Sequence, residues 1–315
     1  MKISFITTVF NEEKTIEGLL ESLNNQTLKP DEVVIVDGGS TDKTLSAISN
    51  FKFPFSNKKI KVRVSIKKGN RSVGRNHAIR NAKKDIIVCS DSGCILDKDW
   101  LINIIKPFSD PKVDVVAGYY KGLAKNAFEK CLIPYVLVMK DKVNPENFLP
   151  ATRSMAFRKL IWEKIGGFDE KLSNNEDYAF SKKLKKFNAN MVFANDAIVN
   201  WIPRKNIIES FIMFYRFALG DGESGLFRPK VAFVFLRYIS GLILVSLYFF
   251  SGNISLLLLV SLSLLSYIFW AILKNFRYIK HPYAYFYLPL LQFVSDFAVL
   301  LGTSIGIVKR LGKRN

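Results

Sequence analysis

Two long apolar segments in the last third of the chain constrain its fold most strongly. They cover about residues 231–250 and 254–273, and each has the roughly 20 residues that a membrane-spanning helix needs. A short, uncharged link at 251–253 joins them, so we expect a helical hairpin. Basic residues flank both outer ends of the pair: Arg228 and Lys230 before it, and Lys274, Arg277 and Lys280 after it. The bias of positive charge towards the cytoplasm therefore predicts that both ends of the hairpin lie inside the cell.

A third apolar segment, at 283–308, differs from these two because Pro289 and Asp296 interrupt it. The basic tail at 309–315 favours the cytoplasmic side, which a re-entrant or interfacial segment would satisfy. A third full span would instead place the tail outside. We expect a third membrane-embedded segment and leave its topology open.

The net charge of +19, from 46 Lys and Arg against 27 Asp and Glu, is spread over the first two thirds of the chain. Such an excess favours a polyanionic partner, and its even spread argues against a nucleic-acid-binding tail. Phosphorylated small molecules and anionic lipids remain as partners. The three scattered cysteines and two histidines do not form a zinc motif and suit a reducing compartment. The first apolar run, at 3–10, is too short for a signal peptide, so we expect the polar part in the cytoplasm.

The first hundred residues alternate between strand and helix patterns. Short runs rich in β-branched residues at 3–9, 33–36 and 86–89 predict buried strands, and apolar alternation at 60–66 predicts another. Apolar residues at helical spacing lie between these runs, for example near 72–82. This β-α-β-α order predicts an α/β domain with a mostly parallel sheet flanked by helices.

Polar clusters follow three of the predicted strands, at 8–12, 37–42 and 91–93. A turn with a helix cap would explain any one of them, since Asn, Asp, Gly and Ser favour turns. In a parallel sheet, however, ligands bind beyond the carboxyl ends of the strands. Three clusters at such ends therefore predict a ligand site there.

The order of these motifs resembles family 2 glycosyltransferases of the GT-A fold. The resemblance covers roughly residues 1–200 and is carried by five parts of the sequence: 3–27, the Asp-Gly-Gly-Ser-Thr-Asp turn at 37–42, Gly-Arg-Asn-His-Ala-Ile at 74–79 followed by Asp91, Gly-Gly-Phe-Asp at 166–169, and Asn-Glu-Asp at 175–177. It implies a nucleotide-diphospho-sugar transferase fold and transfer of a sugar from a nucleotide-sugar donor.

The resemblance also implies which residues bind the donor. The nucleoside-binding role falls on the end of the first strand and the following turn: Thr8, Phe10, Glu12 and Asp37. The segment near the donor contributes three more residues: Arg71, Arg75 and Asn76. Guanidinium groups suit a diphosphate because they can bind its oxygens in pairs, although an exposed helix face would carry the same residues. Gly38 stands where the family often has a second acid, which weakens the assignment of base recognition to this turn.

Asp91 falls where the family has its metal-binding Asp-x-Asp motif, and the resemblance implies that it holds Mg²⁺ or Mn²⁺. Such hard cations often take only one or two carboxylates together with substrate phosphates. The sequence departs from the pattern at two positions. Gly93 replaces the second Asp, and Trp201 stands where many relatives have a metal-binding His. A metal held mainly by Asp91 and the diphosphate is the resulting prediction.

Glu176 and Asp177 match the acidic pair on the acceptor side, in which the Asp is the general base. A sugar hydroxyl needs such a base, because it is a poor nucleophile until its proton is removed. One base opposite the leaving group implies inversion at the anomeric carbon. The alternative is a pair of first-turn acids that stabilise a helix at 178–187.

These expectations divide the chain into a GT-A catalytic domain at 1–205, an interfacial amphipathic helix and linker at 206–230, a membrane region at 231–308 and a basic tail at 309–315. The helix at 207–219, ended by Gly-Asp-Gly at 220–222, could equally pack on the catalytic domain. We expect a multi-pass protein of the cell membrane with a cytoplasmic catalytic domain.

The predicted function is that of an inverting glycosyltransferase of the hexosyltransferase type. It would use a UDP- or GDP-sugar donor and a lipid-linked or glycan acceptor, with membrane lipids as partners and no nucleic acid. One alternative is a polyprenyl-phosphate sugar synthase, in which a lipid phosphate attacks directly. Another is an inactive membrane scaffold that binds nucleotide sugars, which the reduced motifs at 37–39 and 91–93 would fit.

Overall fold

The computed structural model of the chain describes residues 1–52, 60–226 and 228–312. These residues form two compact units. The first comprises Met1–Leu123 and Leu137–Ile202, and the second comprises Ala124–Val136 and Pro203–Asn315. Lys313 and Arg314 of the predicted basic tail lie outside the described residues.

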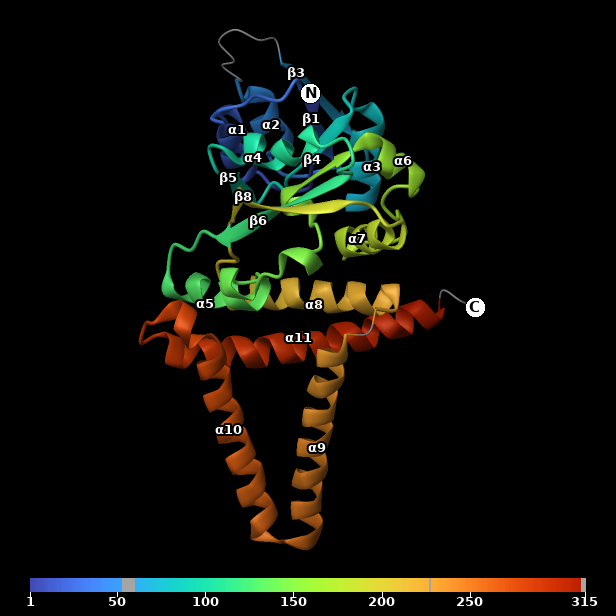
Figure 1. Cartoon of the computed structure of the whole chain (residues 1–315). Helices are drawn as coiled ribbons and strands as arrows, with labels where there is room; N and C mark the ends of the chain where they lie inside the picture. The colour runs from blue at the N-terminus through green and yellow to red at the C-terminus, as the bar shows by residue number, and fades with distance from the viewer. Residues whose placement is uncertain (53–59, 227, 313–315) are drawn as a thin grey trace. The chain divides into compact units, whose positions relative to one another are not determined.

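The first unit is built on a sheet whose described strands follow the order β3-β2-β1-β4-β7-β6-β8-β5 (Figure 1). These strands are β1 (Ile3–Val9), β2 (Glu32–Asp37), β3 (Lys61–Ile66), β4 (Ile86–Cys89), β5 (Cys94–Leu96), β6 (Val115–Gly122), β7 (Met155–Arg158) and β8 (Met191–Trp201). The first four strands are mutually parallel, as predicted. The other half is mixed: β7 runs antiparallel to β4 and β6, and β8 runs parallel to β6 but antiparallel to β5.

Helices connect and cover these strands: α1 (Ile16–Asn24), α2 (Thr44–Asn50), α3 (Arg71–Asn81), α4 (Trp100–Ile105), α6 (Lys159–Lys164) and α7 (Glu176–Lys186). The central strands β1, β2 and β4 are buried almost throughout, which explains their continuous apolar sequence. The core joins sheet residues such as Ile6 and Phe157 to Ile79 of α3 and Phe180 of α7. This packing fixes the starts of α3 and α7 against the sheet.

The loop after β1 precedes the first helix. Asn11, Glu12 and Glu13 lie in this loop, because α1 starts at Ile16. Asn11 has a positive φ of 54°, and its side chain accepts a hydrogen bond from the Thr41 backbone N–H at 2.8 Å. This contact ties the two loops after β1 and β2 together.

The second unit consists of α5 (Ala127–Val136), α8 (Ile207–Ser224), α9 (Pro229–Ser251), α10 (Ile254–Ile279) and α11 (Ala284–Gly312). Helices α9, α10 and α11 are each long and apolar enough to cross a membrane. In their most apolar windows, 0% of α9, 6% of α10 and 39% of α11 is buried within the protein. The first two form a hairpin (Figure 1), and the greater burial of α11 shows that it has a different environment.

Helix α11 packs along α8, and Figure 1 shows the two helices side by side. Glycines allow their backbones to touch: a Cβ atom on Gly306 would lie 2.5 Å from the Leu219 carbonyl oxygen, and one on Gly222 would lie 2.9 Å from the Gly306 Cα. The expectation that Gly-Asp-Gly at 220–222 ends the helix is therefore wrong. These small residues serve helix packing, and α8 continues to Ser224, where Gly225 with φ 72° caps it.

Asp296 joins α11 to the hairpin. Its carboxylate is buried and accepts hydrogen bonds from Arg237 at 3.2 Å and from the Tyr238 hydroxyl at 3.1 Å, both on α9. It also accepts from the Tyr267 hydroxyl of α10 and, at 3.0 Å, from Gln292 of α11 itself. A buried carboxylate is tolerated when it is paired and hydrogen-bonded in this way. The acid that interrupts the third apolar segment is thus a junction between three helices.

Candidate active site

Asp91 follows β4, at the carboxyl end of the parallel half of the sheet. Helix α3 packs against β1 and β2, and its N-cap Asn70 accepts a hydrogen bond from the Val73 N–H at 3.0 Å. Gly74 allows α3 to approach β1 closely, because a Cβ atom there would lie only 3.0 Å from the Thr8 side chain. This close packing carries Arg75 to the carboxylate of Asp91.

Arg75 bridges two carboxylates that are distant in the sequence. Its Nη2 lies 3.0 Å from Asp91 Oδ1, and its Nη1 lies 2.5 Å from Glu176 Oε1. The Arg75 and Glu176 side chains are only 6% and 5% exposed, respectively, whereas the Asp91 side chain is 38% exposed. The resulting Asp91–Arg75–Glu176 network joins the end of β4 to the start of α7 and leaves Asp91 open to ligands.

The charges of this network reinforce one another. Burial opposes ionisation of Arg75, but Glu176, Asp91 and Asp177 together raise its pKa. Burial would likewise raise the pKa of Asp91, yet the guanidinium groups of Arg75, Arg153 and Arg71 hold that pKa below its ordinary value. Asp91 is therefore an ionised carboxylate beside several fixed cations.

Asp177 is a different kind of acid from Asp91. It follows Glu176 in the first turn of α7, which Asn175 precedes in the left-handed conformation with φ 56°. Burial, and then the adjacent Glu176, raise the pKa of Asp177 above its ordinary value. Its Oδ1 accepts only the N–H of its own neighbour Tyr178 among the described contacts. A partly exposed carboxylate with a raised pKa is a suitable proton acceptor.

The predicted nucleoside residues gather at the ends of β1 and β2, where Val9 pairs with Asp37. Both oxygens of Asp37 are engaged by its own turn, through the N–H groups of Gly39 and Ser40 at 2.8 Å and the Ser40 hydroxyl at 2.6 Å. Phe10 is 58% exposed at the same edge, and the Glu12 N–H donates to Thr44 at 2.7 Å. The structure thus brings these four residues together, with Thr8 packed against α3.

Arg71, Arg75 and Asn76 are placed differently from one another. Arg71 is exposed at the start of α3, and its positive charge lowers the pKa of Asp91. Asn76 is buried, donates to the Phe168 carbonyl and to Glu170 at 2.8 Å each, and accepts from the Phe168 N–H at 3.0 Å. It therefore holds the turn at 166–169, and only Arg71 of the three has a side chain exposed to a ligand.

Three residues near Asp91 are absent from the sequence-based prediction: Tyr120, Thr152 and Arg153. The Thr152 hydroxyl lies 3.4 Å from Asp91 Oδ1. The Arg153 guanidinium carbon lies 5.1 Å from the centre of the Tyr120 ring and 5.5 Å from that of Trp201. One arginine among 46 basic residues carries no distinguishing pattern, so only the fold could identify it.

The metal prediction rests on Asp91. Within the part of the chain that the structure describes, no three His, Cys, Asp or Glu side chains are grouped to hold an ion. Among the described residues, both side-chain hydrogen bonds of the Asp91 carboxylate involve Oδ1, which leaves Oδ2 for another ligand. One carboxylate oxygen together with diphosphate oxygens suits Mg²⁺ or Mn²⁺, so the residues present fit a metal bound jointly with the substrate.

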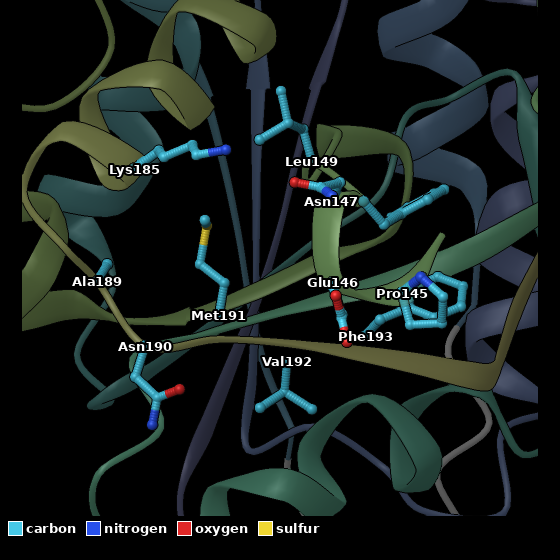
Figure 2. Close-up of a pocket in the computed structure, with 11 residues that line it drawn as sticks. Pro145, Glu146, Asn147, Leu149, Lys185, Ala189, Asn190, Met191, Val192 and Phe193 are labelled. Carbon is cyan, nitrogen blue, oxygen red and sulfur yellow. The ribbon is translucent and has the colours of Figure 1, made fainter. Parts of the chain in front are cut away.

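A pocket of about 240 Å³ lies in the first unit (Figure 2). Residues 145–149 and 189–193, with Lys185, line it, and none of the predicted site residues does. It sits at the start of β8, whereas Trp201 beside Arg153 is at the end of that strand. The ring centre of Phe148, which lines the pocket, is 5.8 Å from that of Tyr120, so the pocket adjoins the aromatic residues beside Arg153.

Comparisons with known proteins agree with this geometry. The family described as Glycosyl transferase family 2 matches residues 4–163, which is half of the chain. The O-antigen chain rhamnosyltransferase RfbN of Salmonella typhimurium is 26% identical over 228 residues, covering 67% of this chain and 71% of that protein. A second relative is 27% identical over 224 residues, covering 67% of this chain and 69% of that protein. It is the dolichyl N-acetyl-alpha-D-glucosaminyl phosphate 3-beta-D-2,3-diacetamido-2,3-dideoxy-beta-D-glucuronosyltransferase of Methanococcus voltae.

Two solved structures show the same fold. The mannosyltransferase PcManGT from Pyrobaculum calidifontis, in complex with GDP-Man and Mn²⁺, matches with a TM-score of 0.63 at 16% identity, over 100% of this chain and 88% of that one. S. aureus TarS 1-349, in complex with UDP-GlcNAc, matches with a TM-score of 0.52 at 23% identity, over 70% and 66%. At these identities the likeness shows the GT-A fold alone. Together with the family match, it establishes that this chain belongs to glycosyltransferase family 2.

Proposed function

We propose that this glycosyltransferase moves a hexosyl group, with inversion, from a UDP- or GDP-sugar to a lipid-linked or glycan acceptor at the cytoplasmic face of the membrane. The observation that carries the proposal is the meeting of Asp91, Arg75, Glu176 and Asp177 at the carboxyl end of the sheet. This is the edge at which α/β sheets bind ligands. The relatives named above support an acceptor that is a glycan or a lipid-linked sugar.

In the proposed reaction Asp177 removes the proton from the acceptor hydroxyl as that oxygen attacks the anomeric carbon. The new bond forms on the face opposite the departing nucleoside diphosphate, which inverts the configuration. Glu176 is a positioning residue in this scheme, because Arg75 holds it and its charge raises the pKa of Asp177. Asp177 is thereby kept ready to accept a proton.

On the donor side, Thr8, Phe10, Glu12 and Asp37 form the proposed nucleoside edge, and Arg71 faces the diphosphate. Arg75 and Asn76 support the site from within, since both side chains are occupied by protein partners. Asp91 would hold Mg²⁺ or Mn²⁺. When bound, the ion would neutralise negative charge that develops on the leaving diphosphate.

The assay that tests this function measures release of nucleoside diphosphate by the full chain purified in detergent. UDP- and GDP-sugars are offered with native lipid extract as the acceptor source, with and without Mn²⁺. We expect release that requires both a donor and the extract and that rises with the metal. Donor binding without release under every condition would contradict the proposal and favour the inactive scaffold.

A polyprenyl-phosphate sugar synthase is the second candidate. A phosphate is already ionised at neutral pH and attacks without a base, so this candidate makes Asp177 dispensable. The same assay distinguishes the two, because a simple polyprenyl phosphate would then replace the lipid extract as acceptor.

For the membrane region we propose that α9 and α10 cross the bilayer as a hairpin and that α11 lies along the cytoplasmic surface beside α8. The burial of α11, its backbone contact with α8 and the basic tail support this arrangement. The domain boundaries at 205, 230 and 308 belong to the same proposal.

Cysteine labelling tests this topology. The native cysteines are all buried, so single cysteines can be added at Ser251, at the hairpin tip, and at Gly312, at the end of α11. We expect an impermeant maleimide to label Ser251→Cys in intact cells and Gly312→Cys only after the cells are broken. Labelling of both in intact cells would show that α11 is a third span.

A further inference from the structure

Arg153 lies in an aromatic slot formed by Tyr120 and Trp201. Tyr120 on β6 pairs in register with Val199 on β8, and Trp201 lies two residues beyond Val199. Because alternate strand residues share a face, both rings lie on the same face of two neighbouring strands. The guanidinium carbon is 5.1 Å and 5.5 Å from the two ring centres, within the range at which ring faces attract cations.

The slot holds Arg153 without satisfying its charge. Its Nε is buried and has no hydrogen-bond partner, and Arg153 forms no ion pair, in each case among the residues that the structure describes. Two other arginines of the same unit are occupied by protein partners. Arg75 binds two carboxylates, and Arg158 donates to the carbonyls of Val113, Phe108 and Asp110. A buried N–H donor without a hydrogen-bond acceptor destabilises the folded protein, and a bound ligand that accepts this hydrogen bond would remove the cost.

The backbone around Arg153 is attached to the loop that carries Asp91. The Ser90 hydroxyl donates to the Arg153 carbonyl oxygen at 3.0 Å, and Thr152 contacts Asp91 at 3.4 Å. The positive charges of Arg75, Arg153 and Arg71 favour the ionised form of Asp91 and lower its pKa. Arg153 and Arg71 therefore lie near Asp91, where the proposed reaction develops negative charge.

We propose that Arg153 binds a phosphate oxyanion of the reacting substrates, either the diphosphate of the donor or the phosphate of a lipid-linked acceptor. A planar guanidinium can donate two parallel hydrogen bonds to such a group. The aromatic slot holds the guanidinium group in one orientation before the substrate binds. Trp201 thus supports a cationic side chain. This inference rests on the transfer reaction proposed above.

The test measures binding without turnover, using Arg153→Met and Arg153→Lys variants of the full chain in detergent. The probes are UDP, GDP and inorganic pyrophosphate for the donor source, and a polyprenyl phosphate for the acceptor source. Arg80→Met is the matched control, because Arg80 is a 59%-exposed arginine of α3 in a surface ion pair. Thermal unfolding identifies any variant that fails to fold, and Arg153→Lys is the milder change.

We expect Arg153→Met to weaken one class of probe by about 10- to 100-fold, the effect of losing charge-assisted hydrogen bonds. The affinity of Arg153→Lys should lie between those of the wild type and Arg153→Met, since Lys keeps the charge but cannot donate two parallel hydrogen bonds. Arg80→Met should bind the probes as the wild type does. Weaker pyrophosphate and nucleotide binding assigns Arg153 to the donor, and weaker polyprenyl phosphate binding assigns it to the acceptor. Folded Arg153 variants that bind all four probes normally would overturn the inference. If these effects appear in a protein without transfer activity, the proposed function fails and the phosphate site stands.

Discussion

Replacement of Asp177 by Asn should reduce nucleoside-diphosphate release about 10²- to 10⁴-fold, the usual contribution of a positioned general base. Asn has nearly the same shape but cannot accept the acceptor's proton. Donor affinity should change little, because Asp177 lies on the acceptor side in the proposed reaction. Release and donor binding are measured on the same detergent-purified preparation. Glu163→Gln is the control, since Glu163 is an exposed carboxylate on α6.

The pH dependence gives a second measure of the same residue. Asp177 must be ionised to act, and burial together with Glu176 raises its pKa, so activity should fall on acidification at a higher pH than for an ordinary Asp, whose pKa is about 3.9. Glu176→Gln removes the adjacent negative charge, which lowers the pKa of Asp177 and should move this acidic limb to lower pH. An Asp177→Asn enzyme that retains full activity would contradict the general-base role and favour direct attack by a lipid phosphate.

Much of the fold follows from local sequence. Strands β1, β2 and β4 are buried on both faces, so their apolar runs identify them directly, and the spacing of Ile16, Leu19, Leu20 and Leu23 matches the buried face of α1. The second half of the sheet is different. Its neighbours β7, β6 and β8 pair across long loops in mixed directions, and no local pattern specifies that order. The acidic motifs were predictable for the same reason as the first strands, because they stand directly at strand and helix ends.

The connections within the site were not predictable. A sequence pattern that places Arg75 near a diphosphate cannot show that Glu176, 101 residues away, occupies its guanidinium. Nor can it show that Tyr120 and Trp201 enclose Arg153. In both cases the partner is chosen by tertiary packing, and an arginine has the same sequence signature whether its charge is neutralised or free.

Replacement of Arg75 by Met should destabilise the first unit by about 3–5 kcal/mol, the cost of leaving a buried charge without its partner. Met keeps much of the side-chain volume, so the loss comes mainly from the carboxylates of Glu176 and Asp91. For a unit of 150–250 residues this corresponds to a fall in Tm of roughly 6–20 °C. Trp100 and Trp162 are buried in this unit, and their fluorescence reports its unfolding in the full chain.

Arg80→Met is the matched control on the same helix. Arg80 and Glu170 are 59% and 43% exposed, and surface pairs of this kind contribute about 0–1 kcal/mol. Adding Glu176→Gln to Arg75→Met should restore part of the lost stability, because one of the two uncompensated charges is gone. Equal Tm values for Arg75→Met and Arg80→Met would show that the buried network contributes no more than a surface ion pair.

The stability lost in Arg75→Met should also shrink as the pH falls. In the wild type Arg75, Arg153 and Arg71 hold the pKa of Asp91 below its unfolded value, so this acid stabilises the fold at neutral pH and loses that contribution as the pH falls through the folded pKa. In the variant, burial of Asp91 and Glu176 without Arg75 favours their protonated forms, so acidification stabilises the folded variant. Both effects reduce the difference in Tm between the wild type and the variant at low pH. A gap in Tm that stays constant from neutral to acidic pH would locate the defect in packing and not in the charge of the Asp91–Arg75–Glu176 network.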